Sequence, residues 1–293
     1  MITIIAHNNN SGLTKDIIIL TDILSKICKV DFRDTSDNLK PLDSNNEICI
    51  FLEAVDKRYY GKYNILIPNQ EWFFRKWFKE LNNFQSIFVK TKIAHQLFSN
   101  LHSNVRYIGF TSLDLYKEDV EKVKECFHTQ GKSVDKGTEI LVDWSPNMPK
   151  INIISNKIEI IKPNVNLIKN RLDDDEFIEM ANKNLIHICP STVEGWGHYI
   201  NEAKSMSNVV ITTNARPMSE LIKDTRFLCQ VIDAEMKLNT VGKWTRTNIQ
   251  QIEFVLSNIL DLDLIEIGKQ NRVEFLENDK LFKETIIDTI KTI

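Results

Sequence analysis

The chain has 293 residues, of which 42% are hydrophobic and 26% charged, a composition typical of soluble globular proteins. This length suits one large or two ordinary α/β domains. A formal net charge of -3 argues against nucleic acid as the main partner, and no apolar run approaches the length of a membrane span.

The first residues and the cysteines indicate a cytoplasmic protein. Residues Met1–Ala6 are apolar but lack the basic segment of a signal peptide, so they are interpreted as a strand. The five cysteines are scattered through mostly apolar stretches, without the paired spacing of a zinc site or a disulfide framework. We therefore expect reduced thiols.

Short apolar runs alternate with helical stretches along the first part of the chain. Six strands are predicted there: Ile2–Ala6, Val30–Phe32, Ile48–Leu52, Asn64–Ile67, Ser86–Val89 and Val105–Ile108. Helices are predicted at Thr14–Cys28, Glu71–Leu81 and Thr91–Leu101. This alternation is typical of a parallel, doubly wound sheet.

A second set of strands follows the charged stretch Asp114–Glu125, which is a candidate linker. It begins near Cys126 and continues with Ile151–Ile154, Lys157–Ile161, Leu185–Cys189, Val209–Thr212 and Phe227–Val231. The tail Gln250–Ile293 reads as two or three helices. The expected fold class is therefore α/β with two Rossmann-like domains, residues 1–115 and 116–272, facing across a cleft. Residues 273–293 are expected to form a helix that packs back on the first domain.

The segment EGWGHYINE places Glu194 and Glu202 around a glycine-rich turn that follows the strand Leu185–Cys189. A loop is expected at Pro190–Gly197 and a helix at Tyr199–Met206. Ligands of parallel sheets lie beyond the carboxyl ends of the strands, near helix N-termini. Because an ionised carboxylate accepts two hydrogen bonds from vicinal hydroxyls, the pair suits two hydroxyl-rich ends of one elongated ligand.

These residues resemble the PS..EG.G....EA signature of GT-B glycosyltransferases, especially the retaining family-4 type. The matching positions are Pro190, Ser191, Glu194, Gly195, Gly197, Glu202 and Ala203. The resemblance implies that Glu194 meets the donor sugar and Glu202 the nucleotide ribose. It also implies a donor site that includes Trp196, His198 and Tyr199. The alternative is an exposed loop with ordinary surface glutamates.

A basic loop after the strand at Cys126–His128 is similar to the first loop of the C-terminal domain in that family. Its residues are Gly131, Lys132, Ser133, Lys136, Gly137 and Thr138, and a helix through Trp144 is expected after them. The resemblance implies that Lys132 and Lys136 hold the donor diphosphate and act in catalysis without metal. Family members often have arginine at the first position, so Lys132 lacks the bidentate fork. The alternative is a solvated basic loop.

Loops of the first domain are expected to face the cleft. His7 and Gly12 follow the first strand and are candidates for a catalytic and a donor-binding residue, although Thr14 there is also explained as a helix N-cap and His7 as a structural hydrogen bonder. Asn69, Glu71 and Thr91 follow later strands and are expected to bind the acceptor. Together with Tyr107–Ser112, these loops are similar to a subgroup of such enzymes common in large viruses and some bacteria, which would place a viral member in the host cytoplasm.

Two further segments are assigned to the donor by the resemblance. Met218 belongs to a loop, 213–220, expected near the sugar or diphosphate, although a turn explains Asn214 and Pro217 equally well. Asn166 belongs to the segment 164–166, expected to follow a strand and contact the base.

An aromatic and basic segment lies at residues 71–92. Such a segment can rest on an anionic membrane surface or hold an acidic acceptor, but core packing with a charged outer face also explains it. No metal site is expected, because the six histidines are isolated and no HxxxH or DxD element accompanies them.

The resulting hypothesis is a retaining, metal-independent glycosyltransferase of the hexosyltransferase type, without a cofactor. It would use a nucleotide sugar such as a UDP-sugar and an unknown acceptor, which could be a glycan, protein, lipid or nucleic acid. The alternatives are a nucleotide-sugar epimerase of the same fold, a catalytically silent glycan or nucleotide-sugar binding protein, and a transferase acting on nucleic acid.

Overall fold

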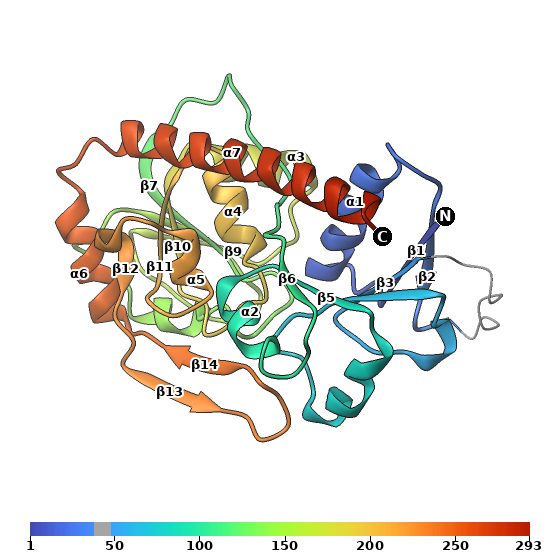
Figure 1. Cartoon of the computed structure of the whole chain (residues 1–293). Helices are drawn as coiled ribbons and strands as arrows, with labels where there is room; N and C mark the ends of the chain where they lie inside the picture. The colour runs from blue at the N-terminus through green and yellow to red at the C-terminus, as the bar shows by residue number, and fades with distance from the viewer. Residues whose placement is uncertain (38–47) are drawn as a thin grey trace. The chain divides into compact units, whose positions relative to one another are not determined.

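The computed structural model of the chain describes residues 1–37 and 48–293, which fall into two compact units (Figure 1). The first unit comprises residues 1–112, 236–243 and 278–293, and the second comprises 113–235 and 244–277. Each unit is built on its own sheet.

The first unit contains a six-stranded sheet in the order β2-β1-β3-β4-β5-β6. Every described strand pair is parallel. The strands are β1 (Ile2–Ala6), β2 (Val30–Asp34), β3 (Ile48–Leu52), β4 (Tyr63–Ile67), β5 (Ser86–Val89) and β6 (Val105–Tyr107). Because β1, β3, β4 and β5 lie inside the sheet, they read as continuous apolar runs that are buried on both faces.

Helices connect these strands. They are α1 (Gly12–Leu24), α2 (Lys92–Phe98) and the short 3₁₀ helices η1 (Lys57–Tyr59) and η2 (Arg75–Asn83). Helix α1 buries Leu13, Leu20 and Leu24, which share one face at helical spacing. Thr91 caps α2 by accepting a hydrogen bond from the Ala94 N–H.

The second unit has a six-stranded parallel sheet in the order β12-β11-β10-β7-β8-β9. The strands are β7 (Val123–Thr129), β8 (Ile151–Ile154), β9 (Val165–Ile168), β10 (Asn184–Cys189), β11 (Val209–Thr213) and β12 (Leu228–Cys229). Central strand β10 is buried along its whole length. The carboxyl ends of β7 and β10 therefore lie side by side in the middle of the sheet.

The remaining elements of the chain are mostly helical. They are η3 (Thr138–Asp143), α3 (Asp174–Lys183), α4 (His198–Ser205), α5 (Met218–Leu221), η4 (Thr225–Phe227), α6 (Ile249–Ile259) and α7 (Leu264–Lys291). Strands β13 (Asp233–Met236) and β14 (Lys243–Arg246) form a separate pair that the sequence did not predict. No helix within the described ranges is both long and apolar enough to cross a membrane.

The expected fold class is confirmed as two α/β domains, each with a six-stranded parallel sheet. One strand was misplaced: Lys157–Ile161 is not a strand, and the edge position beside β8 is occupied by β9. The side chain of Ile161 is 99% exposed, so its apolar character does not mark a buried position.

The predicted helix Glu71–Leu81 is also wrong, since a 3₁₀ helix begins only at Arg75. Phe74 pairs with Thr240 in an antiparallel bridge, and the Arg75 N–H donates to the Asn239 carbonyl at 2.9 Å. Residues 74 and 75 are thus bonded to residues 239 and 240 of a distant segment. An α-helix that started at Glu71 would instead use the backbone groups of residues 74 and 75 within the helix.

Candidate active site

The loop after β10 brings Ser191, Glu194 and Tyr199 together. The Ser191 hydroxyl donates to Glu194 Oε1 at 2.5 Å and is also hydrogen-bonded to the Tyr199 hydroxyl. Because the single Ser191 proton is directed at the carboxylate, the Tyr199 hydroxyl is the donor to Ser191. Burial raises the pKa of Tyr199 well above its ordinary value, which keeps this phenol protonated.

Lys136 comes from the loop after β7 and completes this cluster. Its ammonium forms an ion pair with Glu194 and lies 3.9 Å from the centroid of the Tyr199 ring. The side chains of Lys136 and Glu194 are only 19% and 10% exposed. A cation and an anion are thus held at the carboxyl ends of β7 and β10, where parallel sheets bind ligands.

Backbone contacts hold the two loops against each other. Gly137 has a φ of 68°, and a Cβ at this position would lie 2.3 Å from the Pro190 carbonyl oxygen. The Thr192 N–H donates to the Asp135 carbonyl at 2.9 Å. Only glycine therefore permits this approach, which sets where Lys136 meets Glu194.

The buried side chain of His128, on β7, is hydrogen-bonded to β10 and to the end of the loop that follows β7. His128 Nδ1 lies 2.8 Å from the Ile188 carbonyl oxygen, and Nε2 lies 2.8 Å from the Thr138 hydroxyl. Since a carbonyl only accepts, Nδ1 carries the proton and Nε2 accepts from Thr138. Burial lowers the pKa of His128 to about 4, so the ring is neutral.

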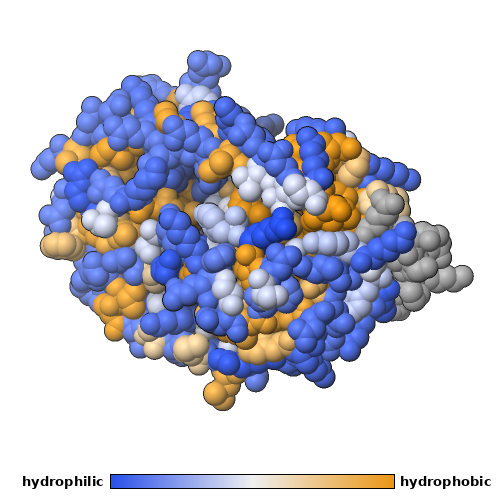
Figure 2. All heavy atoms as spheres, viewed as in Figure 1, coloured by the Kyte–Doolittle hydropathy of each residue, from blue (hydrophilic) through white to orange (hydrophobic). Residues whose placement is uncertain are grey.

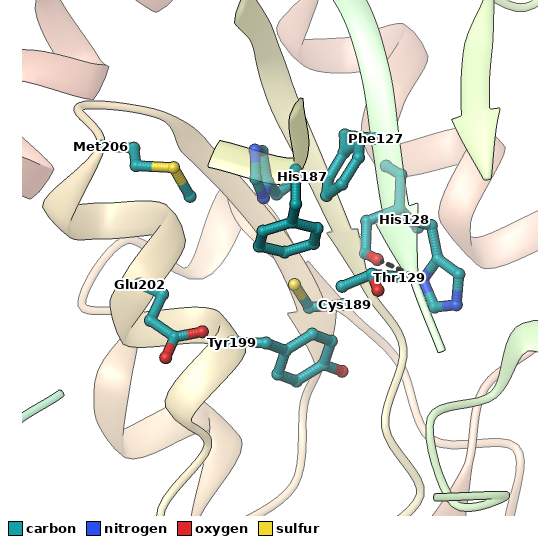
Figure 3. A pocket seen from close by; sticks show the side chains of 10 residues that line it. Phe127, His128, Thr129, His187, Cys189, Tyr199, Glu202 and Met206 are labelled. Carbon is teal, nitrogen blue, oxygen red and sulfur yellow. Dashed lines mark hydrogen bonds between the residues drawn. The ribbon is translucent and has the colours of Figure 1, made fainter. Parts of the chain in front are cut away.

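Glu202 lines a small hollow beside this cluster, with a cavity volume of about 10 Å³. Figure 3 shows Tyr199 and Glu202 on α4, with Thr129 and Cys189 on the neighbouring strands. Glu202 is 3% exposed and lies on the second turn of α4, as expected from its spacing after Glu194. The remaining wall is largely apolar, with Phe127, Phe177, Ile188 and Met206.

The other residues expected in the basic loop have local partners. The Lys132 carbonyl accepts from Lys157 Nζ at 3.1 Å, and the Ser133 hydroxyl accepts from the Asp135 N–H at 3.1 Å. Gly131 has a φ of 59° with open space around its Cα. The turn at Gly131 is thus much less crowded than that at Gly137.

The glycine-rich turn leads directly into α4. Gly197 is the N-cap of this helix with a φ of 89°, and His198 is its first residue. Trp196 is 5% exposed, and Gly195 stands between it and Glu194. These residues therefore stand at the N-terminus of α4, where backbone N–H groups favour anions.

Two of the expected donor residues lie elsewhere in the second unit. Met218 begins α5 and is completely buried in the hydrophobic core. Asn166 lies inside β9 rather than in a loop after a strand, because the strand expected before it is absent. Its side-chain amide donates to Asn152 Oδ1 at 2.9 Å, two residues before the carboxyl end of β9.

In the first unit, His7 and Gly12 bracket the loop after β1. The His7 side chain is 56% exposed, and its Nδ1 lies 3.5 Å from Asp34 Oδ1. Gly12 is the first residue of α1, behind a capping box formed by Ser11 and Thr14. Thr14 is thus the third residue of the helix rather than its cap.

Asn69 belongs to a polar network at the carboxyl edge of the first sheet. Its amide donates to Glu53 Oε2 at 2.8 Å and its oxygen accepts from Lys90 Nζ at 3.0 Å. Lys90 also forms an ion pair with Asp16, and both of these side chains are 2% exposed. Burial raises the pKa of Glu53 above its ordinary value.

The other two expected acceptor residues lie beside this network. Glu71 is 5% exposed, and Thr91 is 1% exposed as the cap of α2. Sequence reasoning overlooked Asp16, Glu53 and Lys90. Glu53 and Lys90 directly follow apolar strands, which was the signal available for them, whereas the burial of Asp16 requires the packing of α1.

Groups of three or more His, Cys, Asp or Glu side chains suited to a metal ion do not occur in residues 1–37 and 48–293. The aromatic segment is divided: Phe73 is buried, Trp77 and Phe78 pack against the core, and Trp72 is 38% exposed.

Solved structures share this fold at low sequence identity. A sucrose-phosphate synthase from Thermosynechococcus elongatus aligns with a TM-score of 0.74 and 10% identity over 99% of this chain and 98% of that one. A glycosyltransferase from Rickettsia africae aligns with a TM-score of 0.64 and 14% identity over 99% and 97%. A structure described as trehalose-6-phosphate from E. coli bound with UDP-2-fluoro glucose aligns with a TM-score of 0.68 and 9% identity. That alignment covers 100% of this chain and 99% of the other.

The sequence profile of the family described as "Glycosyl transferases group 1" matches residues 157–250. About a third of the chain thus matches a glycosyltransferase family, and the whole chain shares the fold of these solved structures. No curated protein matches the chain by sequence at a significant level. The matched range contains Glu194 and Glu202 but not the Lys132 and Lys136 loop.

Proposed function

We propose that the protein is a glycosyltransferase that transfers a sugar from a nucleoside-diphosphate sugar to an acceptor hydroxyl, with retention and without metal. The observation that carries this proposal is the cluster of Lys136, Ser191, Glu194 and Tyr199 at the carboxyl ends of β7 and β10. It supplies one cation for phosphate and one carboxylate for sugar hydroxyls within a single buried network.

Each part of the donor has a proposed partner. Glu202 accepts the two ribose hydroxyls, Glu194 accepts hydroxyls of the transferred sugar, and Lys132 and Lys136 bind the diphosphate. A UDP-sugar is the favoured donor, which is supported by the UDP-2-fluoro glucose bound in the E. coli structure of the same fold. The transferred group is proposed to be a hexose.

In the proposed reaction the bond between the anomeric carbon and the diphosphate oxygen breaks. The acceptor hydroxyl oxygen bonds to the anomeric carbon on the same face, and its proton passes to the departing phosphate. Lys132, Lys136 and the N-terminus of α4 stabilise the negative charge that develops on the leaving diphosphate.

The acceptor is proposed to bind the first unit near Asn69, Glu71 and Thr91, with His7 as a proposed catalytic residue and Gly12 as a proposed donor contact. The Glu53, Asn69 and Lys90 network offers polar groups of both signs for a hydroxyl-rich molecule. All five cysteines are free thiols, which suits the reducing cytoplasm that we propose as the place of transfer.

The test is calorimetric binding of UDP-, GDP- and ADP-sugars to the wild type and to Glu202→Gln, with and without a chelator. Glu202→Gln is expected to weaken the preferred donor about tenfold to a hundredfold, because a charge-assisted contact to the ribose becomes neutral. Glu179→Gln is the matched control, since Glu179 is an exposed residue of α3 in the same unit.

Equal affinity of Glu202→Gln and the wild type would contradict the ribose assignment, and loss of donor turnover with chelator would contradict metal independence. Product analysis separates the alternatives: an epimerase converts the donor without an acceptor, and a binding protein leaves it unchanged. The anomeric configuration of the transfer product decides between retention and inversion.

A further inference from the structure

A surface of the first unit combines exposed apolar side chains with a concentration of positive charge. It consists of residues 72–79 and 236–243, which we call the aromatic-basic patch. Leu238 is 89% exposed, Met236 60% and Trp72 38%. Figure 2 shows apolar atoms projecting at the lower edge of the view, where Figure 1 shows the end of the β13–β14 pair.

The two segments of the patch are fastened to each other. The Arg75 N–H donates to the Asn239 carbonyl at 2.9 Å, and Phe74 forms a bridge with Thr240. Lys237 Nζ lies 5.7 Å from the centroid of the Trp72 ring. The tip with Leu238 is therefore presented as part of one surface with the exposed indole.

A close backbone contact anchors the same tip. A Cβ at Gly242 would lie 2.6 Å from the Cα of Glu71, so no other residue fits there without displacing the backbone. Behind the patch, Phe73 is fully buried in the core of the unit. The exposed apolar side chains thus belong to segments whose backbone is packed against the core of the unit.

The charge of the patch is opposite to that of the whole chain. Residues 72–79 and 236–243 contain five basic side chains and no acidic one, while the chain carries a net charge of -3. The basic residues, all exposed, are Arg75, Lys76, Lys79, Lys237 and Lys243. The nearest acidic residues along β13, Asp233 and Glu235, lie 3.5 and 3.3 Å from the guanidinium of Arg246.

We propose that the aromatic-basic patch binds the surface of a lipid bilayer that contains anionic phospholipids. Basic side chains are attracted to the negative surface, Trp72 suits the headgroup region, and Leu238 and Met236 enter the acyl boundary. Nucleic acid offers phosphates for the cations but no apolar phase for the two aliphatic side chains. The combination of both kinds of side chain therefore favours a membrane.

This proposal does not depend on the donor site, so the two are tested separately. The full chain is sedimented with vesicles of phosphatidylcholine alone and of phosphatidylcholine mixed with phosphatidylserine. Binding is expected only to the anionic vesicles and is expected to weaken as salt is raised. Comparable binding to both vesicle types, or to neither, would overturn the proposal.

Variants separate the apolar and the electrostatic contributions. Leu238→Ser is expected to weaken vesicle binding about tenfold, and Lys237→Gln and Lys243→Gln about fivefold each. Leu281→Ser is the matched control and is expected to bind like the wild type, because Leu281 is 63% exposed in the same unit but lies outside the patch.

Two further outcomes would contradict the proposed mode of binding. Unchanged vesicle binding by Leu238→Ser would mean that no apolar insertion occurs. Tighter binding of a single-stranded RNA oligonucleotide than of anionic vesicles, with loss in Lys237→Gln, would assign the patch to nucleic acid. Donor affinity, measured in parallel by calorimetry, is expected to remain unchanged in all these variants, which distinguishes loss of membrane binding from misfolding.

Discussion

Lys136 and Glu194 form an ion pair between two loops that lie 58 residues apart in sequence. Ser191 shares the carboxylate, and Tyr199 covers the ammonium. Since both charged groups are largely buried, removal of one leaves the other without its counterion in a poorly solvated place. The pair is therefore relevant both to stability and to the proposed transfer.

Lys136→Met is expected to lower kcat/KM for sugar transfer by about two orders of magnitude, because one stabilising charge on the leaving diphosphate is lost. Lys183→Met is the control, since Lys183 is an exposed residue at the end of α3. Steady-state kinetics with the preferred donor measure the effect. Activity within a factor of two of the wild type would remove Lys136 from the proposed machinery.

Gly137→Ala is expected to destabilise the second unit by more than about 2 kcal/mol, because its Cβ would collide with the Pro190 carbonyl at an already left-handed φ. Gly131→Ala is the matched comparison. Gly131 has a similar φ of 59°, but a Cβ there would meet no other atom, so only the cost of about 1 kcal/mol for the left-handed backbone is expected. Chemical denaturation measures the free energy of unfolding of both variants. An equal loss of stability in the two would show that the backbone at Gly137 moves to accommodate the Cβ.

Protonation of His128 and His187 is expected to destabilise the second unit in acid. Burial lowers their pKa values to about 4 and about 3, from 6.5 in the unfolded chain. Between pH 6.5 and these values the unfolded state binds more protons, so the free energy of unfolding falls as the pH is lowered. For His128 alone the loss amounts to roughly 3 kcal/mol by pH 4.

Denaturation curves from pH 7.5 to pH 4.5 test this dependence. His128→Gln retains a side-chain amide near Thr138 and removes the titrating ring, so its stability is expected to fall less steeply with decreasing pH than that of the wild type. Parallel slopes for the two proteins would exclude His128 as the cause.

Lys90 and Asp16 are expected to be strongly coupled in the first unit. Lys90→Met or Asp16→Leu alone leaves a buried charge without its partner and is expected to cost about 3 to 5 kcal/mol. The double variant removes both charges and is expected to recover most of this loss. A double-mutant cycle on unfolding free energies measures the coupling, and simple additivity of the two losses would contradict it.

The strands and the glycine turns were largely predictable, because their signals are local. Apolar runs such as Ile48–Leu52 and Leu185–Cys189 coincide with strands β3 and β10. The order Glu194, Gly197, Glu202 predicted a strand, loop and helix, and α4 begins at His198. Each of these features depends on residues close together in the chain.

The errors arose where distant segments compete or combine. Lys157–Ile161 has the alternation of a strand, but β9 occupies the only position beside β8. The helix expected from Glu71 is interrupted by backbone bonds to residues 239 and 240, which are more than 160 positions away. Asn166 was assigned to a loop because the strand was expected at Lys157–Ile161, whereas the residue lies inside β9.

The sequence by itself determined the two parallel α/β domains and the candidate donor residues, since apolar periodicity and the spacing of glycines and carboxylates are local properties. Only the tertiary structure decided that Lys136 meets Glu194, that Lys90 is buried against Asp16, and that Trp72 and Leu238 share one surface. These relationships depend on sheet order and loop packing, which join residues that no local pattern connects.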